Sequence, residues 1–279
     1  MKERKVSEMD RTMGEESAPA SGTFDHAGSI RSAGAPDRRG QEALLALRSH
    51  CAGCNLRDLC LPCGLDGEDM ARVTDLVYTR KRVKAGESLY QAGTPFKSLY
   101  AVRTGFFKSF VITDGGRVQV TGFQMSGEII GVDGIDGDKH TLNVAALEDS
   151  EVCVIPYVRL EEISALVPAL RRQLHRVMAR EIVRDHGVMM LLGSMRAEER
   201  VATFILNLSK RFVARGYAAA RFELRMTREE IGSYLGLKLE TVSRIFSKFQ
   251  ELGLLAVQKK SIAIRDIEAL KEILHQAER

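Results

Sequence analysis

The chain has 279 residues, of which 44% are hydrophobic and 28% are charged, and its net charge at pH 7 is +4. This length allows one large or two ordinary domains, and no run of about 18 apolar residues is present that would cross a membrane. Residues 1–11 alternate charges and lack the apolar stretch of a secretory signal, so we expect the reducing cytoplasm.

Positive charge is concentrated in the last third of the chain. Residues 193–279 contain 16 lysines and arginines and 11 acids, an excess of five, so the remainder is close to neutral. Such a basic segment is where a polyanion would bind. Residues 1–41 mix Ser, Gly, Ala, Pro and both charges with few apolar side chains, and this composition predicts a disordered tail.

Four of the five cysteines fall within thirteen residues, after a short helical pattern at residues 42–48, and the fifth cysteine is Cys153. Thiols this close together bind a soft metal, bind an iron–sulfur cluster or form disulfides. A disulfide framework suits small secreted proteins, whereas this chain is long enough for a core of its own. The clustered thiols are Cys51, Cys54, Cys60 and Cys63.

The number of thiols leaves two kinds of centre open. The four clustered cysteines could close a tetrahedral zinc site, although only five residues separate Cys54 from Cys60 and structural zinc sites usually space their pairs further apart. A cubane cluster accepts three thiolates from one loop and a fourth from a remote segment, which Cys153 could supply. The cysteines alone therefore favour an iron–sulfur cluster only modestly.

The region from residue 76 to residue 156 predicts an antiparallel roll or barrel. β-rich runs at 98–102, 106–112 and 118–123 alternate with glycines, and turn signals recur every eight to twelve residues. Asp114-Gly115-Gly116 between two of these runs is a good hairpin turn. We therefore place a β-roll domain at residues 67–166, after a cysteine-rich segment at 42–66.

A long helix is predicted at residues 167–192, where Gly187 is the only Gly or Pro after residue 169. A helix of this length between two domains more often pairs with a copy of itself, so we predict a homodimer. The stripe of residues predicted to pair with the second copy, here called the seam, has a spacing of 3, 4, 3 and 4 residues through His175, Met178, Ile182, Asp185 and Met189. Asp185 is the one carboxylate in this seam. Either it stays solvated at the edge, or it faces its own copy across a two-fold axis and repels it.

Residues 193–279 predict a winged helix-turn-helix. Thr227 and Glu230 form a capping box for a first short helix, Gly236 makes the turn, and a second helix spans about 238–251. Residues 252–265 form a predicted hairpin, or wing, with Lys259 and Lys260 at its tip. The alternative is an ordinary pair of core helices. The second helix argues against it, because it has a polar face of the kind that reads bases, made of Glu240, Thr241, Ser243, Arg244 and Lys248.

Together these motifs resemble the FNR branch of the CRP/FNR regulators. The resemblance covers about residues 51–268. It rests on the C-x2-C-x5-C loop, on Cys153 between Glu151 and Pro156, on Ala197-Glu198-Glu199-Arg200 and on residues 240–244. It implies an α+β fold with a cyclic-nucleotide-binding-like jelly roll, a long dimerisation helix and a C-terminal winged helix-turn-helix. It also implies that a [4Fe–4S] cluster is held by Cys51, Cys54, Cys60 and Cys153.

The resemblance implies a transcriptional regulator rather than an enzyme. In this family the cluster is intact without oxygen, and the dimer then binds palindromic operators with TTGAT-like half-sites and activates or represses transcription. Oxygen degrades the cluster towards [2Fe–2S], and the dimer falls apart. Arg244 would read guanine, Glu240 would accept hydrogen bonds from bases of the opposite strand, and Ser243 would contact thymine. RNA polymerase is an implied partner, although Arg117 stands where an acidic contact residue is common.

The chain departs from the family pattern at two places that bear on its site. Cys63 is an extra thiol, and Lys238 replaces the Thr that often caps the second helix. A cyclic-nucleotide site needs an Arg after the Gly127-Glu128 turn, but residues 138–142 contain none, so we expect no cyclic nucleotide. The alternative within the family is a regulator with zinc or redox-active thiols. No GxGxxG, P-loop or Ser/His/Asp arrangement supports a redox enzyme.

Overall fold

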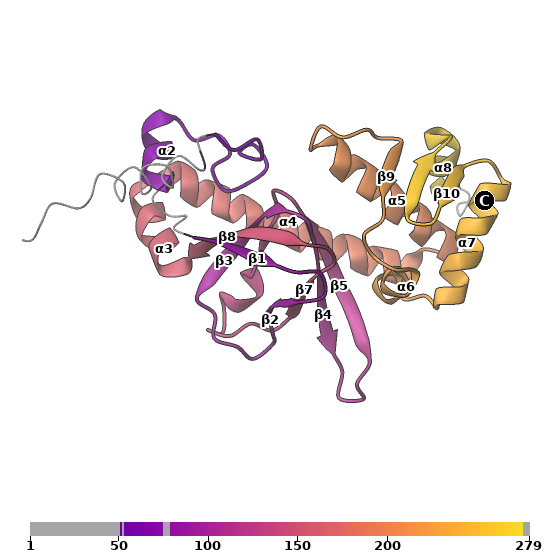
Figure 1. Cartoon of the computed structure of the whole chain (residues 1–279), viewed down its shortest axis with the longest axis horizontal. Helices are drawn as coiled ribbons and strands as arrows, with labels where there is room; N and C mark the ends of the chain where they lie inside the picture. The colour runs from indigo at the N-terminus through magenta and orange to yellow at the C-terminus, as the bar shows by residue number, and fades with distance from the viewer. Residues whose placement is uncertain (1–50, 52, 75–78, 276–279) are drawn as a thin grey trace, which may run out of the picture.

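The computed structural model describes residues 51, 53–74 and 79–275, so the tail predicted at 1–41 and the short helix predicted at 42–48 lie outside the described residues. Figure 1 shows a β-roll followed by a long helix and a smaller C-terminal domain of helices and short strands. This order confirms the predicted α+β architecture.

The β-roll consists of two antiparallel four-stranded sheets. One sheet has the order β1-β8-β3-β6 and the other the order β2-β7-β4-β5, and a core that includes Phe107 and Val144 fills the space between them. The strands are β1 (Thr79–Val83), β2 (Ser88–Tyr90), β3 (Ser98–Thr104), β4 (Phe106–Ile112), β5 (Val118–Met125), β6 (Ile129–Ile130), β7 (Asn143–Ala146) and β8 (Ser150–Pro156).

Turns join the strands where the sequence predicts them. The β4–β5 hairpin closes through Gly116, which has a φ of 75°, a value that favours glycine, and the N–H of Thr113 donates to the carbonyl of Arg117 at 2.9 Å. The hairpin predicted at residues 114–116 is therefore confirmed. Helix α2 (Gly67–Thr74) precedes the roll, and the 3₁₀ helix η1 (Val132–Gly134) and helix α3 (Tyr157–Leu166) complete it.

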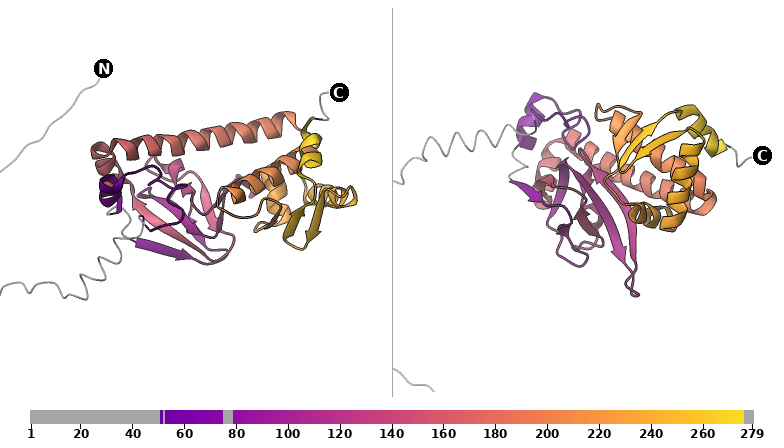
Figure 2. Two further views of the ribbon diagram at one scale, coloured as in Figure 1. Left: turned by 90° about the horizontal axis from the view of Figure 1, so that it is seen from above. Right: turned by 45° about the vertical axis from the view of Figure 1, so that its right-hand side comes forward.

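Helix α4 (Pro168–Ser194) has 27 residues and is therefore about 40 Å long. It begins at Pro168, which suits the first helical position because its missing N–H would be unsatisfied there. Figure 2 shows α4 passing along the β-roll and on to the C-terminal domain. One face is buried against the roll through Leu170, Leu174 and Val177. Four residues of the predicted seam are exposed and Met178 is half-buried against the roll core; the five are His175, Met178, Ile182, Asp185 and Met189.

The C-terminal domain is a winged helix-turn-helix. The hydroxyl of Thr227 accepts a hydrogen bond from the N–H of Glu230 at 3.1 Å, Glu230 accepts one from the N–H of Thr227 at 2.7 Å, and Gly236 ends the helix with a φ of 63°. The predicted capping box and turn are thus confirmed. The elements are α5 (Ala197–Val213), β9 (Arg221–Glu223), α6 (Arg228–Leu235), α7 (Leu239–Glu251), β10 (Leu255–Gln258), β11 (Ser261–Ile264) and α8 (Ile267–His275).

The two domains share a hydrophobic core, in which Phe123 of β5 packs near Phe204 of α5 and Tyr234 of α6. Polar contacts reinforce the junction: Lys108 donates to Glu230 at 2.7 Å, and the N–H of Val120 donates to the hydroxyl of Ser233 at 2.9 Å. The helix-turn-helix is consequently held in one orientation on the β4–β5 hairpin.

Arg200, the last residue of the Ala-Glu-Glu-Arg motif, holds the bend between α4 and α5. Its guanidinium donates to three carbonyls, of Leu192 at 2.8 Å, Met195 at 2.9 Å and Leu235 at 3.0 Å. These carbonyls belong to the end of α4, the connecting residues and the end of α6. A single side chain therefore joins the long helix to the helix-turn-helix.

Candidate metal centre and nucleic-acid interface

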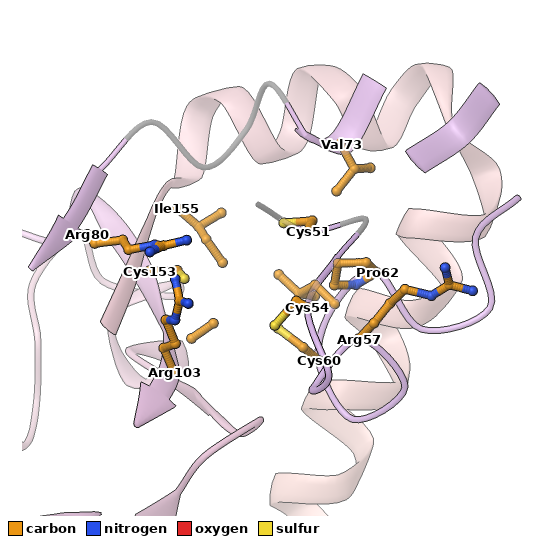
Figure 3. Close-up of a pocket in the computed structure, with 12 residues that line it drawn as sticks. Cys51, Cys54, Arg57, Cys60, Pro62, Val73, Arg80, Arg103, Cys153 and Ile155 are labelled. Carbon is orange, nitrogen blue, oxygen red and sulfur yellow. The ribbon is translucent and has the colours of Figure 1, made fainter. Parts of the chain in front are cut away.

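A cavity lies between the cysteine loop and the face of the β1-β8-β3 sheet (Figure 3). It brings together three thiols of the loop and Cys153 of β8, whereas Cys63 does not line it. The lining residues are Cys51, Cys54, Arg57, Cys60, Leu61, Pro62, Val73, Arg80, Ala101, Arg103, Cys153 and Ile155. The four thiols that the family resemblance implies as ligands thus face one space.

Consecutive tight turns curl the loop around this space. The N–H groups of Cys54, Arg57 and Cys63 each donate to the carbonyl three residues before, at 3.1 to 3.2 Å. Leu61 is buried in the core that also contains Ile155, and the side-chain amide of Gln173 on α4 donates to the carbonyl of Cys60 at 3.3 Å. The loop is therefore anchored on both the sheet and α4.

Burial and mutual repulsion make the cavity thiols weak acids. Burial raises the pKa of Cys60 to about 12, although a backbone hydrogen bond from Leu61 opposes it. Burial and the neighbouring Cys153 and Cys54 raise the pKa of Cys51 to about 11. Burial also raises the pKa of Cys153, and Arg103 opposes the rise. A metal centre that bound here would have to displace these protons.

The cavity offers four thiols as donors for a metal centre. All five cysteines are free thiols. Among the residues that the structure describes, no three His, Cys, Asp or Glu side chains come close enough to hold a single metal ion. A cubane holds its thiolates further apart, because each thiolate binds a different iron.

A second site is the exposed face of α7. Glu240 and Arg244 are exposed and lie one turn apart, and Ser243 between them is half-buried. The opposite face is buried in the domain core through Val242 and Phe249. An α-helix with a polar outer face of this kind fits the major groove of DNA.

The wing follows α7 directly. Strands β10 and β11 pair with Gln258 opposite Ser261, so Lys259 and Lys260 form the exposed two-residue turn. Lys259 has a φ of 56°, as hairpin turns of this kind require. The predicted wing is therefore confirmed as a structure. Lys238 makes no side-chain cap on α7, as the sequence departure suggested.

Comparison with known proteins identifies the family. Residues 199–273 match the family described as a Crp-like helix-turn-helix domain, and residues 80–165 match the cyclic nucleotide-binding domain. The transcriptional activator protein FnrA of Stutzerimonas stutzeri is 48% identical over 219 residues, which are 78% of this chain and 90% of that protein. The chain belongs to the FNR-type regulators of the CRP/FNR family.

Two further relatives agree with this assignment. The fumarate and nitrate reduction regulatory protein of Escherichia coli K12 is 42% identical over 224 residues, covering 80% of this chain and 90% of that protein. The structure of FixK2 from Bradyrhizobium japonicum superposes with a TM-score of 0.65 at 32% identity, covering 70% of this chain and 96% of that one. The protein is thus a DNA-binding transcriptional regulator and not an enzyme. In the part of the chain that the structure describes, no helix is long and apolar enough to cross a membrane.

The cyclic nucleotide-binding fold of this CRP/FNR protein encloses a second cavity of about 550 Å³ between the roll and α4. Three carboxylates line it, Asp133, Glu181 and Asp185, and Arg184 on α4 is the only arginine in the lining. Arg184 lies 3.2 Å from Glu181 and 3.8 Å from Glu128. Burial raises the pKa of Glu181, with Arg184 opposing it. This cavity is poorly suited to an anionic cyclic phosphate.

Sequence reasoning missed two groups of charged residues in this FNR-type chain. Glu128 was considered only as part of a Gly-Glu turn, yet it accepts hydrogen bonds from Arg211 and Arg215 of the DNA-binding domain. Arg80 and Arg103, which line the thiol cavity, carry no motif that would single them out. For Arg80 a signal was available: the alternation of side chains along a strand can place it on the same sheet face as Cys153.

Proposed function

We propose that the protein is an oxygen-sensing [4Fe–4S] regulator that acts in the cytoplasm. Without oxygen it binds palindromic TTGAT-like operators as a homodimer and activates or represses transcription through RNA polymerase, and in air it loses the cluster and becomes an inactive monomer. The observation that carries the proposal is the shared cavity of Cys51, Cys54, Cys60 and Cys153. The names of its relatives, which include the regulator of fumarate and nitrate reduction, are in keeping with it.

The ligands come from two parts of the fold, and this arrangement suits a sensor. Three thiols belong to a loop that packs on α4 through Gln173, and Cys153 belongs to β8 of the roll. When bound, the cluster supplies a centre that dissolved oxygen can oxidise. The protein's own part is to hold the loop against the sheet, so that loss of the ligand bonds frees the loop from β8.

The geometry supports the cluster over the zinc alternative. A structural zinc ion needs four ligands at about 2.0–2.3 Å from one point. Cys63, which a loop-only zinc site would require, lies outside the cavity lining, so the loop offers only three thiols to the cavity and Cys153 is the fourth. We also propose that no cyclic nucleotide binds, because the charged residues that line the cavity beside α4 are three carboxylates and one arginine.

The proposal is tested by anaerobic purification followed by controlled admission of air. We expect brown protein with about four irons and four sulfides per chain, dimeric in sedimentation and bound to a TTGAT-like palindrome. Air should remove the visible absorbance, the dimer and the DNA binding together. Colourless protein that holds one zinc per chain and binds DNA equally in air would overturn the proposal.

A further inference from the structure

The sheet face that carries Cys153 also carries three arginines. Arg80 on β1 and Ala101 on β3 are the cross-strand partners of Cys153, and Arg82 on β1 is the partner of Glu151. Directly opposed side chains in an antiparallel pair start about 4.5–5.5 Å apart. Arg80 therefore begins next to the thiol of Cys153, inside the cavity that it helps to line.

Arg103 reaches the same cavity because it follows Ala101 by two residues on β3, and alternate residues of a strand face the same side of the sheet. The register of β3 against β8 shifts between Val102 and Thr104, so Arg103 is the extra residue of the bulge. Val102 packs inside the roll, whereas Arg103 lines the thiol cavity. Figure 3 shows the guanidinium groups of Arg80 and Arg103 beside Cys153, facing the loop thiols.

Glu151 forms ion pairs with these guanidinium groups but makes no good hydrogen bonds to their N–H donors. Its carboxylate oxygens lie 3.8 Å from Nε of Arg80, 3.5 Å from Nε of Arg103 and 3.7 Å from Nε of Arg82, which are ion-pair distances rather than good hydrogen bonds. Nε of Arg80 is buried and has no hydrogen-bond partner among the described residues. A buried donor without a partner is costly, so it calls for an acceptor that the described residues do not supply.

We propose that Arg80 and Arg103 aim N–H donors at the sulfur atoms of the bound cluster and thereby slow its loss in air. This inference rests on the proposed function. A cubane held by four thiolates is an anion, and nearby hydrogen bonds and positive charge raise its reduction potential. Oxidation moves an electron from the cluster to dissolved oxygen, which is reduced. Two guanidinium groups at the cavity wall make that transfer less favourable.

Arg82 provides a matched control. It is on the same strand as Arg80 and faces the same Glu151, but its side chain is 92% exposed and it does not line the cavity. Arg80→Gln, Arg103→Gln and Arg82→Gln each remove one positive charge and keep a shorter, polar side chain. Arg103→Lys keeps the charge and removes the planar fork of donors.

The measurement uses full-length protein purified anaerobically. Iron and sulfide content establishes that each variant is loaded, and the decay of visible absorbance in air-saturated buffer gives the rate of cluster loss. We expect Arg80→Gln and Arg103→Gln to lose the cluster about tenfold faster than wild type, Arg103→Lys to lie between, and Arg82→Gln to match wild type. The reduction potential of the loaded protein should fall in the same order.

Two results would contradict the inference. If loaded variants of Arg80 and Arg103 decay at the wild-type rate, the guanidinium groups do not act on the cluster. If Arg82→Gln accelerates the decay equally, the effect is one of general charge and not of cavity donors. A wild-type protein without iron and sulfide overturns the proposed function as well, whereas a loaded wild type with unaltered variants overturns this inference alone. Far-UV circular dichroism separates misfolded variants from informative ones, and Arg103→Lys keeps the test available if a glutamine variant misfolds.

Discussion

Oε2 of Glu128 accepts a hydrogen bond of 2.7 Å from Nη2 of Arg211, and this contact joins the β-roll to the first helix of the DNA-binding domain. Arg215 donates to the other carboxylate oxygen, also at 2.7 Å. Gly127, the preceding residue, has a φ of +87° and leaves so little space that an added Cβ would meet Leu59 of the cysteine loop at 2.9 Å. The cysteine loop and the DNA-binding domain therefore both contact the Gly127-Glu128 turn.

Glu128→Gln should destabilise the chain substantially. Arg211 and Arg215 are largely buried, so removing the carboxylate charge leaves two guanidinium groups without their counter-ion. Breaking a buried ion pair from one side costs about 3 kcal/mol. Chemical unfolding of the aerobic protein measures this loss, and Glu272→Gln, at an exposed position on α8, is the control. Equal unfolding free energies for the two variants would show that the contact contributes nothing.

The same carboxylate predicts a pH dependence. Burial alone would raise the pKa of Glu128, but Arg211, Arg184 and Arg215 outweigh it and hold the pKa below its usual range. The unfolded chain therefore binds the proton more readily, and the stabilisation is complete above the ordinary carboxyl pKa and is lost as the pH falls through the folded-state value. Unfolding free energies of wild type and Glu128→Gln should converge in acid. A difference that stays constant with pH would contradict this assignment.

Local signals account for the elements that the sequence predicted well. Gly116 and Gly236 sit where a positive φ is needed, and the Thr227–Glu230 capping box depends only on residues three apart. The 3-4 spacing of α4 is equally local, and the pairing seam that it predicts stays a prediction. Each of these features is decided by a short stretch of chain, so a reader of the sequence can find it.

The charged groups around the site could not be predicted from short stretches of sequence. Glu128 meets Arg211 across 83 positions of sequence, and nothing near either residue indicates the other. Arg103 reaches the thiol cavity because its face of β3 is paired with the face of β8 that carries Cys153, and this pairing depends on the register of two strands far apart in the sequence. The thiols were found because cysteine is rare and its spacing is informative, whereas arginine is common in this chain.

Cys153→Ser and Cys63→Ser should behave differently. We expect the first to abolish anaerobic iron loading and operator binding, because Cys153 is the cavity thiol that ties the loop to β8, and the second to leave both nearly intact. Iron content and gel-shift titration under nitrogen measure the two properties. The reverse pattern would mean that the loop closes its own site with Cys63.

Arg244→Ala should cost about 1–3 kcal/mol in operator binding and relax the preference at one guanine position. Arg244 and Glu240 are exposed on the outer face of α7, where both can reach base edges in the major groove. Binding to a set of single-base operator variants measures the preference. An Arg244→Ala protein that kept the full preference would remove α7 as the reading helix.

The wing lysines serve as a contrast to Arg244. Lys259 and Lys260 occupy an exposed turn, so they are placed to contact phosphates rather than bases. Replacing both by Ala should weaken binding to every sequence alike and make the dependence on salt less steep. If these variants changed the sequence preference instead, the wing would be reading bases.

Asp185→Ala should dimerise and bind operator DNA in air, even without a cluster. Asp185 is exposed on the predicted seam of α4. It lies one turn after Glu181, whose pKa is raised chiefly by burial and also by the charges of Glu128 and Asp185. Across a two-fold axis each chain would bring this carboxylate towards its copy, and repulsion would hold the protein near the monomer–dimer balance. Shifting a two-state equilibrium such as that between monomer and dimer from 1:99 to 99:1 needs about 5.5 kcal/mol. If repulsion at the seam costs only a few kcal/mol, the binding of one cluster can supply enough free energy to shift the equilibrium to the dimer.

Sedimentation of the aerobic protein tests directly whether the charge of Asp185 opposes dimerisation. Asp185→Asn keeps the size of the side chain and removes its charge, so it should dimerise as Asp185→Ala does if repulsion is the cause. Arg176→Ala is the control, because Arg176 is exposed on a different face of α4. If Asp185→Ala sediments as a monomer in air like wild type, Asp185 stays solvated at the edge of the seam, and the balance is set by other residues of α4.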